Sequence, residues 1–394
     1  MSYTFGVVFF VVALLVSVML HEAGHFSTAK KFGMKASRFF VGFGPTLWST
    51  QRGETEYGVK AIPAGGFVKI VGMTDLEEIE PGDEDRAFYK QPAHQRLVVL
   101  AAGSVVHFII AIVLLFLVIA TTGDILKAQT TLTIDSVSRC VPLDPNEAAC
   151  KSTDPAAPAH GKLQSGDRVV AVNGRSVPSY DDLRAQISAS PGRALALTVI
   201  RHGQQMTVNV TPYAVKQAGK TIGRIGVAPL VRPAPVSVAD AVPRTFTTLG
   251  TMMADTGRAL GQLPHQVSQI LENKPRAPTG ALGPVDIARV SGQIAQAKVS
   301  FGERLANLVA IVAQLNFFVG VFNLLPLLPL DGGHIAIVLY EEGRRRVYRL
   351  FGRRDPGRVD LMKVMPFTYA VVAVFVGLSL LLLYAGIFNP VTIQ

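Results

Sequence analysis

The run FGVVFFVVALLVSVMLHEAGH, residues 5–25, decides the fold. Residues 5–20 carry no charge, and the apolar character continues through His21 to Ala29. A helix needs about 20 apolar residues to cross a hydrocarbon core of about 30 Å. The run therefore predicts a membrane-spanning helix. We expect it to be retained, because it lacks the charged segment that opens a cleaved signal peptide.

Three further segments have the apolar length of a membrane span: residues 97–122, 305–328 and 366–387. The composition agrees, because 49% of the 394 residues are hydrophobic and 17% are charged. Soluble domains carry about 25% charged residues. The predicted fold class is thus a membrane α-helical bundle of four transmembrane helices.

Basic residues gather in the two short loops that follow the first and third spans. They are Lys30, Lys31, Lys35 and Arg38 in one loop, and Arg344, Arg345, Arg346, Arg349, Arg353, Arg354, Arg358 and Lys363 in the other. Because Lys and Arg mark the cytoplasmic side, we expect both loops inside the cell and the termini and residues 123–304 outside. The net charge of +10 then needs no nucleic acid as a partner, since no basic stripe interleaved with aromatic residues is present.

The first span ends in the pattern H-E-x-x-H, formed by His21, Glu22 and His25. Residues four apart lie on one face of a helix, so both imidazoles reach one metal ion. Glu22 is placed to act on water as a general base rather than to bind metal. Ionisable side chains inside a span are costly and functional by default. The pattern therefore predicts a catalytic Zn²⁺ site and not a pair of packed core histidines.

A catalytic zinc takes three protein ligands and leaves one position for water. The best third ligand is Asp331, within NLLPLLPLDGG, residues 323–333. Pro326 and Pro329 break the third helix just before it, and about twenty apolar residues place it in the same leaflet as His21. A helix-capping carboxylate is the alternative interpretation of Asp331, and His334 is a weaker alternative ligand.

The H-E-x-x-H pattern on the first span, together with N-x-x-P-x-x-P-L-D-G-G on a later one, resembles the site-2 protease family of intramembrane metallopeptidases. The resemblance covers nearly the whole chain, and it points to the bacterial branch that cleaves anti-sigma factors. It implies hydrolysis of a peptide bond by zinc held at His21, His25 and Asp331, with Glu22 as the base. By family analogy Asn323 holds unwound substrate or steadies an oxyanion, with helix packing as the alternative; Asn316 is a second candidate.

The stretch from Gly53 to Phe67 is strand-like and punctuated by glycines. In the family this stretch forms a β-hairpin that dips into the membrane from the cytoplasmic side. An unpaired strand edge can hold an extended peptide, so Gly65, Gly66 and Phe67 are predicted to bind substrate. One departure concerns the second span, where the family usually has G-P-x-x-N-F and this chain has GSVVHF, residues 103–108. His107 then contacts substrate or metal, or is a buried polar group satisfied by a neighbouring helix.

Residues 129–213 are predicted to form a small extracytoplasmic α+β domain. Alternating strand-like runs surround GKLQSGDRVVAVNG, residues 161–174, and a helix is expected at 181–189, capped by Ser179. This order resembles a PDZ domain of the bacterial protease type, which adds a peptide as an extra strand. Cys140 and Cys150 are predicted to form a disulfide in an oxidising compartment, with two unpaired thiols as the alternative.

The predicted organisation follows from these segments. It comprises a first transmembrane helix at 1–30, a loop with the hairpin at 31–95, a second transmembrane helix at 96–123, a PDZ domain at 124–215, an amphipathic helical region at 216–304 broken by Pro243 and Pro264, a third transmembrane helix with the L-D-G motif at 305–335, a basic loop at 336–365 and a fourth transmembrane helix at 366–394.

The expected protein is a multi-pass protein of the bacterial plasma membrane, with its active site near the cytoplasmic side. Its partners would be a single-span membrane protein, trimmed beforehand by a site-1 type protease, and the lipid bilayer. Each of three rival functions predicts one sequence feature that distinguishes it from this protease. An inactive PDZ scaffold predicts a broken ligand set, a zinc transporter or sensor needs more ionisable residues in the second and fourth spans, and another class of membrane metallopeptidase takes a downstream Glu as third ligand.

Overall fold

The computed structural model describes residues 1–73, 79–143, 150–151, 153–217, 220–272, 276, 282–297 and 299–389. The chain divides into two compact units. The first, here called the membrane unit, combines Met1–Thr122 with Val238–Gln394, and the second, the β-rich unit, is Gly123–Ser237.

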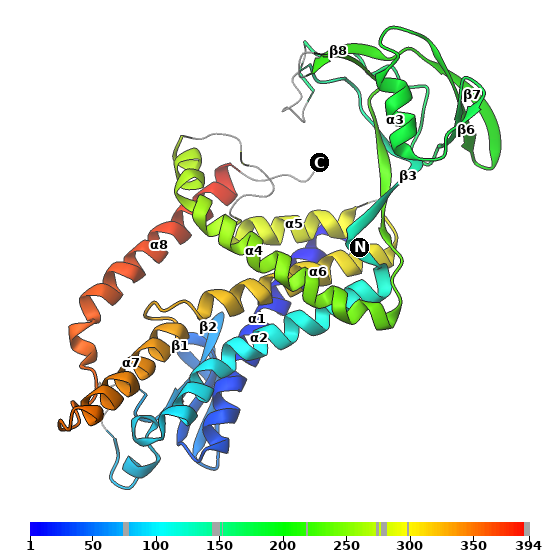
Figure 1. Ribbon diagram of the computed structural model, residues 1–394. Helices are drawn as coiled ribbons and strands as arrows, with labels where there is room; N and C mark the ends of the chain where they lie inside the picture. The colour runs from blue at the N-terminus through cyan, green and yellow to red at the C-terminus, as the bar shows by residue number, and fades with distance from the viewer. Residues whose placement is uncertain are drawn as a thin grey trace. The chain divides into compact units, whose positions relative to one another are not determined.

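Four helices in the described residues are long and apolar enough to cross a membrane, as predicted. They are α1 (Tyr3–Lys31), α2 (Ala93–Thr122), α6 (Phe301–Asn323) and α8 (Met365–Phe388). Helix α2 packs against both α1 and α6, and the three run side by side in Figure 1. Ser2 caps α1, because its hydroxyl accepts a hydrogen bond from the Phe5 amide.

The third span ends earlier than the sequence suggested. Helix α6 stops at Asn323, and a new helix, α7 (Asp331–Leu350), begins at Asp331. The two prolines between them cannot supply backbone donors, which ends α6. Asp331 is thus the first residue of α7, and the predicted loop at 336–365 is helical as far as Leu350.

The segment after the β-rich unit also differs from the prediction. It contains a single 34-residue helix, α4 (Val238–Leu271), which continues through Pro243 and Pro264. Each proline removes one backbone donor, yet the helical spacing of the apolar residues continues past both. A shorter helix, α5 (Pro284–Gln296), follows and packs against α1, α6 and α8. The expected breaks at the two prolines are therefore wrong.

A two-stranded sheet in the membrane unit is made by β1 (Ala36–Arg52) and β2 (Thr55–Ile70). Residues 38–41 of β1 pair with residues 66–69 of β2 and also with residues 56–59. The run 66–69 therefore has β1 on one side only, and its other edge faces α1. Short 3-10 turns, η1 (Glu84–Arg86), η2 (Phe88–Lys90) and η3 (Leu361–Lys363), complete this unit.

The β-rich unit surrounds helix α3 with strands. Its main sheet has the order β10-β3-β4-β6-β7, with β5 paired to β4, and β8 and β9 form a separate pair. The strands are β3 (Asp124–Val137), β4 (Arg168–Val172), β5 (Arg175–Ser176), β6 (Leu195–Arg201), β7 (Gln204–Val210), β8 (Tyr213–Gln217), β9 (Lys220–Arg224) and β10 (Val227–Ala234). The unit continues past residue 215 because β10 returns to pair with β3.

Helix α3 (Tyr180–Ser188) begins as the sequence predicts. The Ser179 hydroxyl accepts a hydrogen bond from the Asp182 amide, and buried Leu183 joins the apolar core of the unit. Cys140 and Cys150 form a disulfide with a Cα–Cα distance of 5.8 Å. Residues 216–236, predicted to begin a helical region, instead contain β9 and β10.

Candidate metal centre

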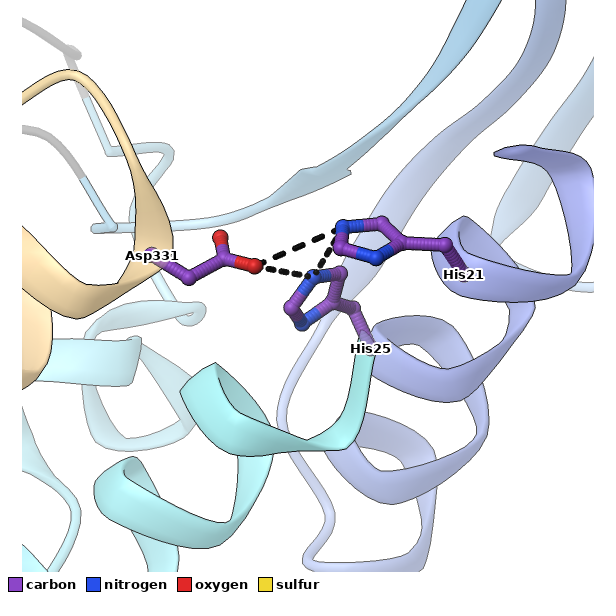
Figure 2. Close-up of side chains that lie close together, drawn as sticks. All are labelled: His21, His25 and Asp331. Carbon is purple, nitrogen blue, oxygen red and sulfur yellow. Dashed lines mark hydrogen bonds and ion pairs between the residues drawn. The ribbon is translucent and has the colours of Figure 1, made fainter. Parts of the chain in front are cut away.

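His21, His25 and Asp331 converge on one point in the membrane unit (Figure 2). The two histidines lie one turn apart on α1, and Asp331 comes from the start of α7. The Nε2 atoms of the histidines are 3.1 Å apart. Asp331 Oδ2 lies 3.4 Å from His21 Nε2 and 3.3 Å from His25 Nε2. Three electron-pair donors thus face one another at nearly equal distances.

These distances fit a zinc ion. Nitrogen and oxygen ligands bind Zn²⁺ at about 2.0–2.1 Å in a tetrahedron, whose edges are then about 3.3 Å. Asp331 Oδ2 is buried and has no hydrogen-bond partner among the described residues. Buried polar atoms normally have partners, so a metal ion explains both the orphaned oxygen and the close approach of the two nitrogens.

Helix α2 sets the orientation of the imidazoles. The His25 Nδ1 atom lies 2.7 Å from the Val99 carbonyl oxygen. A carbonyl only accepts, so the proton sits on Nδ1 and the lone pair of Nε2 faces the cluster, as in zinc-bound histidines. Gly103 lies beside both rings: a Cβ there would be 2.4 Å from His21 Cε1 and 2.5 Å from His25 Nε2. Only glycine leaves room for the two rings.

Glu22 faces the edge of β2. Its Oε2 accepts a hydrogen bond of 3.0 Å from the Val68 amide. No described residue makes a hydrogen bond to its Oε1. Gly66 contacts the same helix, since a Cβ there would lie 2.5 Å from Met19 Sδ. Phe67 stacks on Phe40 with the ring centroids 5.6 Å apart. The predicted substrate-binding residues Gly65, Gly66 and Phe67 therefore lie next to the H-E-x-x-H helix.

Ion pairs at the turn of the hairpin hold it to the end of α1. Arg86 donates hydrogen bonds of 2.6 and 3.0 Å to Glu54, and Lys30 lies 3.3 Å from the same carboxylate. These contacts, those from Arg86 first, lower the pKa of Glu54 to about 2 against the opposing effect of burial. Arg86 also donates to the Gly33 carbonyl, just after α1. The hairpin and the helix of the cluster are therefore tied together.

A second polar cluster lies on the same face of α2. The His107 Nδ1 atom is 2.8 Å from Asn316 Oδ1, and Asn316 Nδ2 donates to Ser17 Oγ at 3.0 Å. All three side chains are buried, and the His107 ring lies 5.0 Å from the His21 ring, centroid to centroid. His107 is therefore a buried polar group satisfied by a neighbouring helix, and it borders the metal cluster without joining it.

Two sequence-predicted residues lie outside the cluster. Asn323 ends α6, and its side chain makes no hydrogen bond within the described part of the chain. His334 lies one turn after Asp331 and lines a small cavity of about 50 Å³ with Arg96 and Glu341. The structure thus groups His21, His25 and Asp331 and leaves the weaker candidate ligand apart.

Sequence reasoning missed the groups that support the cluster. Val99 and Val68 contribute backbone atoms, which any residue type can supply. The residue types at these positions therefore do not indicate their role. Gly103 stands in the small-residue run Ala101–Ser104 of the second span, and that run was the available sign of close helix contact. The ion pair between Arg96 and Glu341 joins residues 245 positions apart, a separation at which no spacing pattern operates.

Comparison with known proteins gives consistent matches over the chain. Residues 9–354 match peptidase family M50. The chain is 37% identical over 409 residues to the zinc metalloprotease Rip1 of Mycobacterium tuberculosis, an alignment that covers 99% of both chains. It is 38% identical over 407 residues to the zinc metalloprotease Rip1 of Mycolicibacterium smegmatis, with both chains fully covered.

Proposed function

The chain belongs to peptidase family M50, and from this membership we propose a zinc-dependent intramembrane endopeptidase that cuts the transmembrane segments of membrane proteins. The observation that carries the proposal is the convergence of His21, His25 and Asp331 from two helices at tetrahedral-edge distances. The inactive-scaffold alternative is not favoured, because it predicts an incomplete ligand set.

His21, His25 and Asp331 would hold the zinc ion, which supplies Lewis-acid polarisation of the scissile carbonyl and acidifies water. Glu22 is the general base in this proposal. The Val68 amide fixes Oε2, which leaves Oε1 to accept a proton from the attacking water. The same carboxyl then gives that proton to the leaving amine, as general acid–base catalysis requires. The α1 helix keeps Glu22 beside the ligands throughout.

Substrate would lie as an extended strand along the outer edge of residues 66–69 of β2. The carbonyls of a transmembrane helix are bonded within the helix, so cleavage requires local unwinding. An unpaired strand edge offers unwound backbone a set of hydrogen-bond partners, and this edge adjoins Glu22 through Val68. The hairpin has exposed apolar side chains, which support its predicted dip into the membrane. They are Phe43, Leu47, Trp48 and Ile62.

The proposed topology puts the β-rich unit outside the cell and the metal centre near the cytoplasmic side. The Cys140–Cys150 disulfide fits an oxidising compartment. His21 lies roughly 27 Å along α1 from Tyr3, at about 1.5 Å per residue, so the cluster is near the inner end of a helix that starts outside. The β-rich unit would be a PDZ domain that contacts substrates, including anti-sigma factors or remnant signal peptides trimmed by another protease.

A cleavage assay tests the proposal. Wild-type and Glu22→Gln proteins are each expressed with a tagged, pre-trimmed single-span substrate, and the metal content of both purified proteins is measured. Wild type alone should release the fragment, while both forms contain zinc, because Glu22 is not a ligand. The control Asp255→Asn changes an exposed carboxylate of α4 and should cleave normally. Cleavage by Glu22→Gln at the wild-type rate would contradict the assigned role.

A further inference from the structure

A buried ion pair joins α7 to α2 at a distance from the metal cluster. Arg96 Nη1 lies 3.1 Å from Glu341 Oε2, and each side chain is only 5% exposed. The second carboxylate oxygen, Oε1, accepts a hydrogen bond of 2.9 Å from the Val359 amide in the segment after α7. The Glu341 carboxylate therefore links three parts of the membrane unit: α2, α7 and the segment after α7 that contains Val359.

The pair has no evident value for stability alone. Removing two charges from water costs about as much as their attraction returns, and apolar replacements are often neutral or stabilising. Apolar packing already joins the two helices, since Val338 and Ile335 of α7 pack with Val99 and Leu100 of α2. Such packing is not directional, whereas a buried ion pair fixes the rotation and register of the helices that carry it.

The position of the pair connects it to the cluster. Asp331 is the first residue of α7 and Glu341 lies in the same helix, about 15 Å further along at 1.5 Å per residue. On α2, Arg96, Val99, Gly103 and His107 share one helical face by their spacing of three and four. Val99 orients His25, and Gly103 leaves room for both imidazoles. This face of α2 therefore contacts the two histidines. Through Arg96 it also contacts α7, the helix that carries Asp331.

We propose that Arg96 and Glu341 are a positioning pair that sets α7 on α2 so that Asp331 reaches His21 and His25. Neither residue touches the metal or the substrate. The inference rests on the proposed metal site. Residues that orient metal ligands from outside typically change metal affinity by about 10–100-fold when replaced. Loss of either charge leaves the other buried without a partner, so α7 shifts and Asp331 moves away from the imidazoles.

The test measures zinc affinity of the purified full-length protein by competition with a chelator. Arg96→Gln and Glu341→Gln should each weaken zinc binding about 10–100-fold. Glu342→Gln is the matched control, because Glu342 neighbours Glu341 but pairs with Arg346 on the outer face of α7, and it should bind zinc as wild type does. With Co²⁺ in place of zinc, the visible spectra of the two pair variants should shift toward that of Asp331→Ala.

Two further variants separate positioning from general loss of stability. Val338→Ala weakens the same helix contact without touching the charges, and Arg96→Lys keeps the charge. Val338→Ala should lower the melting temperature but keep zinc affinity, and Arg96→Lys should bind zinc more tightly than Arg96→Gln. The proposal is overturned if Val338→Ala loses as much zinc affinity as Arg96→Gln, or if Lys restores nothing.

The same titrations tell two failures apart. Wild-type zinc affinity in Arg96→Gln and Glu341→Gln, together with weakened binding in Asp331→Ala, would remove the positioning pair and leave the metal site standing. Unchanged zinc affinity in Asp331→Ala itself would contradict the proposed metal site, and the positioning pair with it.

Discussion

The two compact units bury different kinds of side chains. The core of the β-rich unit is apolar, with residues such as Leu183 and Val199, and the buried carboxylate of Asp167 is paired with Arg201. The membrane unit also has a buried apolar cluster, which includes Val99 and Val338, but in addition it buries His25, Asn316 and Glu341 between its helices. Apolar burial drives folding in water, but lipid is as apolar as a helix surface, so burying apolar side chains there gains little.

This contrast predicts different effects of substitutions in the two units. In the β-rich unit, a buried residue chiefly contributes to the free energy of unfolding. In the membrane unit, a buried polar residue is retained for what it binds or orients, since ionisable groups there are costly. Substitutions of core residues in the first unit should therefore change stability while sparing zinc. Substitutions of the polar residues buried around the metal cluster in the second unit should chiefly change zinc binding.

The largest effect is expected for Leu183→Ala in the β-rich unit. Leu183 is fully buried in the apolar core, and replacing a buried leucine by alanine costs about 2–5 kcal/mol. Thermal unfolding of the full-length protein should show an earlier transition for this unit, with zinc content unchanged. Loss of zinc in Leu183→Ala would contradict the expectation that the core of the β-rich unit affects stability and not metal binding.

Arg201→Gln should give the next largest loss of stability. Arg201 donates two hydrogen bonds of 2.7 Å to Asp167, and hydrogen bonds to charged groups contribute about 1.5–3 kcal/mol. Burial alone would raise the pKa of Asp167, but the bonds from Arg201 and the Gln164 amide outweigh it and lower the pKa below its ordinary value of 3.8.

The pH dependence follows from that direction. Because the folded state has the lowered pKa, the contribution of Asp167 to stability is complete above pH 3.8 and is lost as the pH falls through the lowered pKa. Wild type should therefore lose stability in this unit on acidification, and Arg201→Gln should lose less. Equal acid sensitivity in both proteins would show that the ion pair does not carry it.

In the membrane unit, Gly103→Ala should act on the metal and not on the fold. The added methyl group would lie within 2.4–2.6 Å of both imidazoles, so the rings must turn and zinc affinity should fall about 10–100-fold, or about 1.4–2.7 kcal/mol. Gly257→Ala in α4 is the matched control, since a Cβ there meets nothing within 4 Å. Chelator competition on the two variants decides the point, and equal affinities would contradict the role of Gly103.

Asn316→Ala should give the smallest of these free-energy changes, a loss of stability. Hydrogen bonds between membrane helices contribute about 0.6 kcal/mol on average, and Asn316 joins His107 and Ser17. We expect a stability loss of about 1 kcal/mol, measured by unfolding in detergent. A loss as large as that of Leu183→Ala would remove the contrast between the units.

The parts of the site that sequence could predict are those with local geometry. His21, Glu22 and His25 fall within five residues of one helix, and Asp331 followed from matched membrane depth. The four spans and the cap at Ser179 also followed from local patterns. Their confirmation reflects the strength of hydrophobic length and capping signals.

The remainder depends on tertiary contacts. The two prolines before Asp331 predicted where α6 breaks but not that α7 continues to Leu350, and the proline signal at Pro264 predicted a break that packing of α4 overrides. The clearance at Gly103 and the backbone bonds from Val99 and Val68 arise only when α1, α2 and β2 meet. Positions that depend on long-range packing leave no periodic pattern, so a single sequence cannot reveal them.

The most direct test of the account is X-ray absorption at the zinc edge of the purified full-length protein and its Asp331→Ala variant. We predict one zinc ion per wild-type chain, bound by two imidazole nitrogens and one carboxylate oxygen. The Asp331→Ala variant should lose the ion or one oxygen ligand. A wild-type stoichiometry and spectrum in Asp331→Ala would contradict the claim that residues 306 positions apart, His25 and Asp331, hold one metal.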